Sequence, residues 1–417
     1  MDQPITSVED RTIAAFDSHD PALSRNPYPT YEQLRSRCPV TWSPSWGGFW
    51  MASGHAEVAS AGRDKAFSTG QVLPDGTLQG VTIPPLGQTG RLVPLEQDAP
   101  ESIKYRRLLA SFYSAGRVRE RLPELRRLAR ESVDAVISDG SCDIVQALTL
   151  RVPAIVTMRD IGLPDERWAE VDALLHKALL AAPHDMAAAR AHGQEITLEI
   201  LEQVEQHRED GTGGGLIPHL LAATVDGRPV DDGDILSILY LLLLGIDPTS
   251  TLTATALLHL TQDQKLRKRL TSDPSLIPQA ADEFLRWMSP VQGTSRTVTT
   301  DTSLGGTTLR PGERVFLSWA AANRDPSAFA EPDAVLIDRE NRDHLAFGAG
   351  PHYCLGAALV RAMFSAMLEQ VLTRMPDYVV ADPDGISYFP DLSSVYGVTA
   401  LPLTYTPGEP TRITDPE

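Results

Sequence analysis

A long uncharged run near the middle of the chain limits what this sequence can fold into. Ile235 to Ile246 reads ILSILYLLLLGI, twelve residues between Asp234 and Asp247. A membrane-spanning helix needs roughly 20 apolar residues, so this run predicts a helix buried in a protein core. Acidic residues at its start suit a helix N-terminus, because the helix dipole favours negative charge there. We therefore predict a long buried helix over about 231–262.

Charge and cysteine content exclude several classes of protein. The 417 residues include 55 acidic and 37 basic side chains, which gives a net charge of −18. This balance argues against a surface that wraps nucleic acid or binds an anionic membrane. Cys38, Cys142 and Cys354 are too few and too far apart for a disulfide framework, and the N-terminus lacks a signal-peptide pattern. We expect a cytoplasmic protein with neither a membrane anchor nor a nucleic-acid partner.

The remaining pattern predicts a mainly α protein with a small β component, built as a single domain over 1–417. About 24 N-terminal and about 12 C-terminal residues are expected to be peripheral. Residues 70–97 read as a long loop, of the kind that usually forms a lid or a binding loop. Apolar spacing and turn signals predict helices within 101–210 and over 264–271, 277–287 and 355–374, and β-hairpins within 291–318.

Residues 347–356, FGAGPHYCLG, form the most distinctive motif. Gly348, Gly350 and Pro351 predict a tight turn before Cys354, and a helical pattern follows it. A thiolate at a helix N-terminus is stabilised by free N–H groups and by the helix dipole. The residues alone leave Cys354 as a nucleophile, a metal ligand, or a buried free cysteine, the commonest fate of such a residue.

The same ten residues match F-x-x-G-x-H-x-C-x-G, the haem-thiolate signature of the cytochrome P-450 family. The resemblance covers residues 25–405 through further motifs in the family's order. It implies the cytochrome P-450 fold with a long central helix over the haem. It also implies haem b (iron protoporphyrin IX), with the Cys354 thiolate as axial ligand. The matching residues are Phe347, Gly350, His352, Cys354 and Gly356.

Residues 283–286, EFLR, resemble the family's E-x-x-R motif. Glu283 and Arg286 lie three residues apart, so they share one face of a helix and can pair. Arg339 follows an ANRDP segment and resembles the arginine that completes a Glu–Arg–Arg network. The resemblance implies that these three residues form a structural network that shapes the haem pocket.

Residues 98–106, DAPESIKYR, resemble the motif D-P-P-E-H-x-x-x-R, whose His and Arg bind the haem propionates. Arg106 matches, whereas Ser102 stands in the place of the histidine. Serine can donate a hydrogen bond but brings no positive charge, which puts propionate binding by this residue in doubt. Arg296 and His352 are the other cofactor-binding residues that the resemblance implies.

Residues 244–249, LGIDPT, resemble A-G-x-[DE]-T-T in the helix over the haem. Gly245, Asp247 and Thr249 match and are the implied catalytic residues. Pro248 replaces the threonine that guides protons to dioxygen, and it should kink the helix. Four alternatives stay open: the kink turns Thr249 towards the haem, the substrate supplies a proton-organising group, the chemistry is atypical, or ordered water carries the protons.

The resemblance also implies a substrate site built from several segments, including the 70–97 loop and the helices around 176–192. Its mostly apolar lining with a few polar groups suits a mid-sized organic molecule. The expected substrate residues are Leu243, Leu244, Val291, Gln292, Thr294, Ser394, Val395 and Tyr396.

Basic residues gather between 104 and 130, where the resemblance places the docking site of an acidic ferredoxin. A solvated helical face is the alternative interpretation. We expect ferredoxin and ferredoxin reductase as separate proteins, together with dioxygen and a small-molecule substrate.

The predicted function is that of a haem-thiolate oxidase or monooxygenase that oxidises a metabolite in a secondary-metabolism tailoring step. Oxidative C–C or C–N coupling, or ring closure, is the alternative that Pro248 suggests. A non-catalytic haem-binding sensor or carrier is the alternative of another class.

Overall fold

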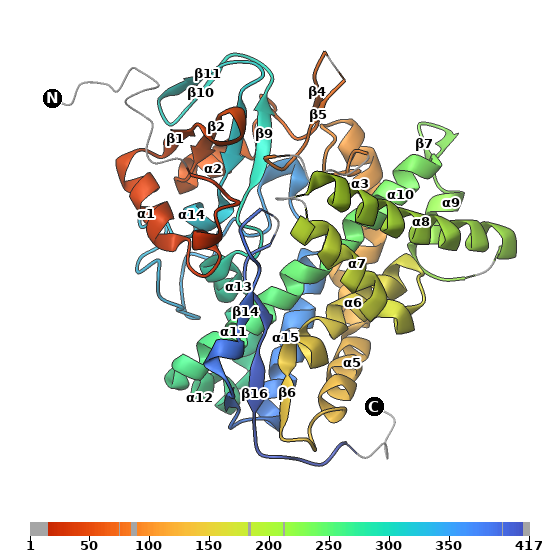
Figure 1. Cartoon of the computed structure of the whole chain (residues 1–417), viewed down its shortest axis with the longest axis vertical. Coiled ribbons are helices and arrows are strands. Elements are labelled where there is room, and N and C mark those ends of the chain that lie inside the picture. Colours follow the sequence, from red (N-terminus) through yellow and green to blue (C-terminus); the bar gives the residue numbers. More distant parts are fainter. Residues whose placement is uncertain are drawn as a thin grey trace.

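The computed structural model describes residues 16–74, 76–84, 90–181, 185–211, 213–393 and 395–411. Helices dominate it and the strands are short, which confirms the predicted fold class (Figure 1). The helices are α1 (Tyr28–Arg37), α2 (His55–Ala61), α3 (Glu101–Tyr113), α4 (Ala115–Glu120), α5 (Leu122–Asp134), α6 (Arg151–Ile161), α7 (Trp168–Ala181), α8 (Met186–Asp210), α9 (Leu216–Ala222), α10 (Asp232–Leu243), α11 (Ile246–Gln262), α12 (Gln264–Ser272), α13 (Ile277–Met288), α14 (Trp319–Asn323) and α15 (Ala357–Arg374).

The main sheet has the strand order β1-β2-β12-β9-β3. β1 and β2 form an antiparallel hairpin, and β12 runs parallel to β2 and antiparallel to β9. The predicted hairpin region therefore supplies two strands of this sheet and the β10–β11 hairpin. The strands are β1 (Val40–Ser43), β2 (Phe49–Ala52), β3 (Phe67–Ser68), β4 (Gln71–Val72), β5 (Leu78–Gln79), β6 (Ser141–Asp143), β7 (Thr224–Val225), β8 (Arg228–Pro229), β9 (Thr294–Val298), β10 (Thr302–Leu304), β11 (Thr307–Leu309), β12 (Arg314–Leu317), β13 (Val379–Val380), β14 (Ser387–Tyr388), β15 (Val398–Ala400) and β16 (Pro402–Thr404).

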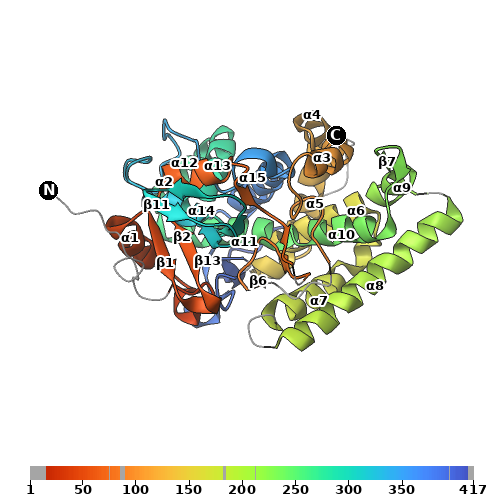
Figure 2. The ribbon, with the colours of Figure 1, turned by 90° about the horizontal axis from the view of Figure 1, so that it is seen from above.

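The strand-rich part, with β1, β2 and α14, lies at one end of the molecule, and helices α8 and α9 lie at the other, with α11 between them (Figure 2). One hydrophobic cluster extends from Phe16 to Tyr405. Phe16 lies within the N-terminal stretch that we expected to be peripheral, yet its ring packs 5.9 Å from those of Tyr31 and Phe316. That part of the N-terminal stretch thus belongs to the core.

The predicted long helix is interrupted. α10 ends at Leu243 and α11 begins at Ile246, so the break lies one turn before Pro248. Pro248 has no N–H to donate to the carbonyl four residues earlier, at Leu244, and its ring clashes with that carbonyl. The helix therefore restarts with the proline in its first turn, where a missing N–H costs nothing.

The segment Asp232–Gln262 is long and apolar enough to cross a membrane by length and composition alone. Of its most apolar window, 56% is buried inside the fold. Leu239, Leu252 and Leu257 along it are completely inaccessible to solvent. The segment, which comprises α10 and α11, therefore lies in the core, in line with the predicted burial.

Candidate active site

The cysteine motif folds into a tight loop before α15. The amide of Cys354 donates to the carbonyl oxygen of Phe347 (2.9 Å), and the amide of Tyr353 donates to that of Gly350 (3.1 Å). Gly350 has a φ of +71°, and a Cβ there would lie 2.5 Å from the carbonyl oxygen of Gly62, next to α2. Only glycine therefore lets the loop lie this close to α2.

The Cys354 thiol is half-buried at the end of this loop. Burial raises its pKa, while the Gly356 amide, which donates to the sulfur, and the cations Arg106 and Arg361 lower it. Arg106 also donates to the carbonyl oxygen of Tyr353 (2.5 Å), which fixes its guanidinium beside the loop. The guanidinium of Arg361 lies 4.7 Å from the ring centre of Phe347. Burial outweighs the two cations and the amide, so the pKa of the Cys354 thiol is raised overall, and these three groups offset only part of the cost of a buried thiolate.

The residues expected at the propionates gather on one side of the loop. Arg296 is buried, and burial lowers its pKa to about 10. Burial and the charges of Arg296 and Arg106 lower the pKa of His352 to about 4. Within the described chain, the buried atoms His352 Nδ1 and Ser102 Oγ have no hydrogen-bond partner. Asp98 lies nearby and accepts hydrogen bonds from the Thr69 amide (3.0 Å) and hydroxyl (3.2 Å).

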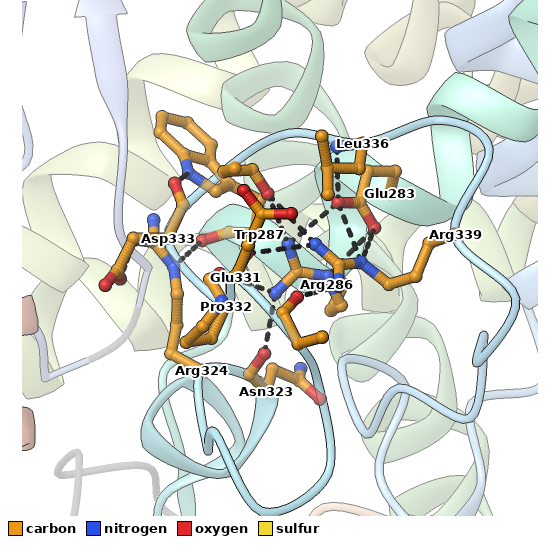
Figure 3. A network of polar contacts seen from close by, with 12 residues as sticks. Glu283, Arg286, Trp287, Asn323, Arg324, Glu331, Pro332, Asp333, Leu336 and Arg339 are labelled. Carbon is orange, nitrogen blue, oxygen red and sulfur yellow. Dashed lines mark hydrogen bonds and ion pairs between the residues drawn. The ribbon is translucent and has the colours of Figure 1, made fainter.

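Glu283, Arg286 and Arg339 come together in a buried network (Figure 3). Arg286 donates to both oxygens of Glu283 at 2.8 Å, and Arg339 Nε lies 3.2 Å from both. Arg286 also donates to the carbonyl oxygens of Asn323 (2.9 Å) and Pro332 (2.8 Å). The network thus ties α13 to α14 and to the segment after it.

Two further contacts connect α13 and α14 to the cysteine loop. The Asn323 side-chain oxygen accepts from the amide of Leu345 (2.6 Å), two residues before the loop. Asp282 accepts from Arg361 on α15 (2.7 Å) and contacts the His344 ring (3.2 Å). The network therefore holds the segments on both sides of the cysteine loop and does not contact the sulfur, which fits the structural role expected for it.

At the start of α11, Asp247 is buried and Gly245 is exposed. The Thr249 hydroxyl donates to the carbonyl oxygen of Gly245 (3.1 Å), within its own helix. Asp247 contacts His176 on α7, whose Nε2 lies 2.9 Å from Asp247 Oδ1. The sequence did not identify His176 as a site residue. The one sequence signal for this residue was its position four residues after Asp172, on the same helix face.

The expected substrate residues differ in exposure. Leu244, Val291 and Thr294 are half-buried, whereas Leu243, Val395 and Tyr396 are buried. Gln292 donates to the carbonyl oxygens of Met288 and Ser289 and accepts from Tyr31, so its polar atoms are used within the protein. Likewise, the Tyr396 hydroxyl donates to the carbonyl oxygen of Arg25 (3.1 Å). Ser394 lies outside the described residues.

The basic segment lies on α3, α4 and α5. Several of its cations form ion pairs within the protein. Lys104 pairs with Asp226, Arg121 with Asp160, and Arg127 with Glu131. The positive charge of this face is therefore partly neutralised.

Comparisons with known proteins agree with this arrangement. Residues 166–375 match the family model of Cytochrome P450. The chain is 31% identical to "Steroid C26-monooxygenase" of Mycolicibacterium smegmatis over 395 residues, 91% of this chain and 93% of that one. The crystal structure of CYP105P1 in complex with filipin I is 30% identical (TM-score 0.83; 92% of this chain, 98% of that one). CYP109E1 from Bacillus megaterium in complex with testosterone is 25% identical (TM-score 0.82; 92% and 99%).

Proposed function

This chain belongs to the cytochrome P450 family, and on that premise we propose that it is a monooxygenase that oxidises a mid-sized organic metabolite with dioxygen. The cysteine loop is the observation that carries the proposal. It presents the sulfur of Cys354 to one amide donor and two guanidinium cations, which offset part of the cost of burying a thiolate, and a metal cation bound to the sulfur would offset the rest.

The residues around the loop fit the iron protoporphyrin IX of a b-type haem. Its two propionates are carboxylates, which need cationic or N–H and O–H partners when they leave water. Arg296 uses one nitrogen, Nη1, for the Thr294 hydroxyl and the Ser295 carbonyl, and makes no other hydrogen bond with a described residue. His352 Nδ1 and Ser102 Oγ are buried donors without a partner in the described chain. We propose that these three residues and Arg106 hold the propionates.

Bound haem supplies an iron centre that activates dioxygen, and a thiolate ligand donates electron density that favours O–O cleavage. At the start of α11, a Cβ at position 245 would lie 3.1 Å from the Leu242 carbonyl oxygen, a tight contact that Gly245 avoids. Asp247 places a carboxylate in the first turn of α11, where it can accept and release a proton. Thr249 fixes the first turn of α11 through its bond to the Gly245 carbonyl.

For the substrate, we propose a largely apolar molecule with a few polar groups. The relative in Mycolicibacterium smegmatis is a steroid C26-monooxygenase, and the two solved neighbours hold filipin I and testosterone. Leu244, Val291, Thr294 and Val395 are the proposed contacts. A tailoring step of secondary metabolism, with electrons from a separate ferredoxin and its reductase, completes the proposal.

Oxidative coupling or ring closure is the second candidate, because Pro248 lacks the hydroxyl that would sit beside Asp247. The mass of the product separates the two reactions. A gain of one oxygen indicates monooxygenation, whereas a loss of two hydrogens or formation of a dimer indicates coupling.

The ferrous–CO difference spectrum tests the proposed function. We expect a Soret band at about 450 nm, the mark of thiolate ligation, and its loss in Cys354→Ser. Cys142→Ser is the control, since Cys142 lies on β6, opposite Leu403 of β16, and is not part of the cysteine loop. Titration of the spin state with testosterone and filipin I then tests the substrate class. A wild-type band at the shorter wavelength of a neutral ligand would refute Cys354 as the thiolate ligand.

A further inference from the structure

Three ionisable side chains meet where α7 crosses the start of α11. Asp172 and His176 lie one turn apart on α7, and Asp247 lies in the first turn of α11. The two nitrogens of His176 face one carboxylate each, with Nδ1 3.1 Å from Asp172 Oδ2 and Nε2 2.9 Å from Asp247 Oδ1. One imidazole nitrogen of His176 and one carboxylate oxygen each of Asp172 and Asp247 all lie within 4.8 Å of one another.

This geometry gives the imidazole a positive charge. Burial lowers the pKa of His176. The hydrogen bonds to Asp172 and Asp247 and the charges of both carboxylates outweigh this effect and raise the pKa to about 10. The charged groups that act on Asp172 are His176 and Asp247. The ring of Phe389, 5.7 Å from that of His176, covers the cluster on another side. His176 is thus the cation between two carboxylates.

The cluster lies beside Pro248, where this chain lacks a side-chain hydroxyl group. Pro248 follows Asp247 directly and has no hydroxyl, and the hydroxyl of Thr249 is donated to the Gly245 carbonyl. The imidazole is therefore the proton-bearing side chain that contacts the Asp247 carboxylate in the described chain. The side chains of Asp172 and Asp247 are 8% and 6% exposed, whereas that of His176 is 25% exposed. Water can thus reach the histidine, while both carboxylates are largely shielded.

We propose that His176 positions Asp247 and supplies it with protons. In this role, His176 replaces the hydroxyl group that is missing at Pro248. The inference rests on the proposed function. The Nε2–H bond of His176 breaks and an O–H bond forms at Oδ1 of the Asp247 carboxylate. The resulting carboxylic acid then gives its proton to the reacting oxygen and becomes a carboxylate again. His176 becomes neutral, keeps its Nδ1–H on Asp172, and regains a proton from water. No electron is transferred in this step.

Two variants and a matched control separate proton supply from packing. His176→Gln retains an N–H donor that cannot release its proton, and Asp172→Asn removes the charge that holds the ring. His207→Gln is the control, because His207 lies on the neighbouring helix α8 and its Nδ1 contacts the carbonyl oxygen of Gln203 (2.9 Å), not a carboxylate. The test measures NADPH-driven dioxygen consumption by the holoenzyme with ferredoxin and its reductase, in H2O and in D2O, with testosterone as the added compound.

We expect dioxygen consumption to fall about 10²-fold or more in His176→Gln, with a larger solvent isotope effect, and to change little in His207→Gln. Pro248→Thr introduced into His176→Gln should restore part of the rate, because it returns a hydroxyl beside Asp247. A second readout is independent of turnover. In the diamagnetic ferrous–CO protein, the His176 ring should stay protonated in NMR titrations to about pH 10, and its pKa should fall in Asp172→Asn.

Separate outcomes address the inference and the proposed function. If His176→Gln keeps a normal ferrous–CO band and matches His207→Gln in rate and isotope effect, the inference is wrong and the function stands. A neutral His176 at pH 7 in the NMR titration overturns it as well. If the wild type itself has no thiolate band, the proposed function fails, and the inference fails with it.

Discussion

Arg286 donates one hydrogen bond of 2.8 Å to each oxygen of Glu283, and both side chains are almost fully buried (1% and 5% exposed). Removing one member of such a pair leaves an uncompensated charge inside the protein. The cost is about 3–5 kcal/mol. We expect Arg286→Leu to lower the free energy of unfolding by about this amount. Urea denaturation followed by circular dichroism measures it.

The matched control is Arg269→Leu. Arg269 also donates to both oxygens of one carboxylate, that of Asp338, at 2.5 and 2.7 Å, but both side chains are exposed. Exposed pairs contribute little to stability. Equal urea midpoints for the two variants would show that burial of the Glu283 pair carries no special energetic weight.

A second prediction concerns the turn at Gly350. An alanine Cβ there would lie 2.5 Å from the Gly62 carbonyl oxygen, at a φ of +71°. The backbone conformation alone costs an L-residue roughly 1–2 kcal/mol, and the clash moves the loop that carries Cys354. We expect Gly350→Ala to shift much of the ferrous–CO absorption from the thiolate band to the shorter wavelength.

Gly306→Ala separates these two effects. Gly306 has a φ of +75° and no atom within 4 Å of a Cβ, so it meets the same backbone strain without the clash. Its thiolate band should stay normal while the protein loses a little stability. A normal band in Gly350→Ala would mean that the loop does not need its close approach to α2.

A third prediction concerns pH. Burial lowers the pKa of His176, but the hydrogen bonds and charges of Asp172 and Asp247 raise it more, to about 10. An unfolded histidine titrates near about 6.5. A pKa raised by folding stabilises the fold fully below the unfolded value, and this stability is lost as pH rises through the folded value. The stability gap between wild type and His176→Gln should therefore be largest below pH ~6.5 and close towards pH ~10.

Urea midpoints of both proteins, measured at intervals across this pH range, give the gap directly. In the Asp172→Asn background, adding His176→Gln should change the stability less, because only one of the two carboxylates still pairs with the imidazolium. A gap that stays constant with pH would show that His176 contributes packing and no charge.

Local patterns predicted most of the long helices, the cysteine loop and the Glu283–Arg286 pair, because each depends on residues close in the sequence. The short helices α1, α2, α9 and α14 were not predicted. The break before α11 was predicted only in part: the proline indicated a kink, but the clash acts one turn earlier, at Leu244. The helix thus ends before the position that the sequence suggested.

Contacts between distant segments could not be predicted in this way. Asp172 and His176 had a visible four-residue spacing, but their partner Asp247 lies 71 residues after His176 in the chain. Gln292 carried polar groups that suited a substrate site, and only the fold shows that Tyr31, 261 residues away, uses one of them. Such pairings follow from helix packing, which no local pattern encodes.

The last prediction concerns Arg296 and the retention of haem. Among the described residues, Arg296 forms hydrogen bonds through Nη1 alone, whereas the partly buried Arg314 donates to the Thr297 hydroxyl and to the carbonyl oxygens of Gly80 and Thr82. Burial lowers the pKa of both guanidinium groups to about 10, so both are desolvated cations. Their difference is that the other N–H donors of Arg296 have no hydrogen-bond partner among the described residues and are available for a propionate.

We therefore expect Arg296→Gln to speed haem loss about 10- to 100-fold, as a charge-assisted hydrogen bond contributes about 1.5–3 kcal/mol. Transfer of haem to apomyoglobin measures the rate. Arg314→Gln should lower the urea midpoint, because its carbonyl partners stay buried, but should change haem loss much less. If the two variants lose haem equally fast, Arg296 acts through the fold and does not bind the propionate.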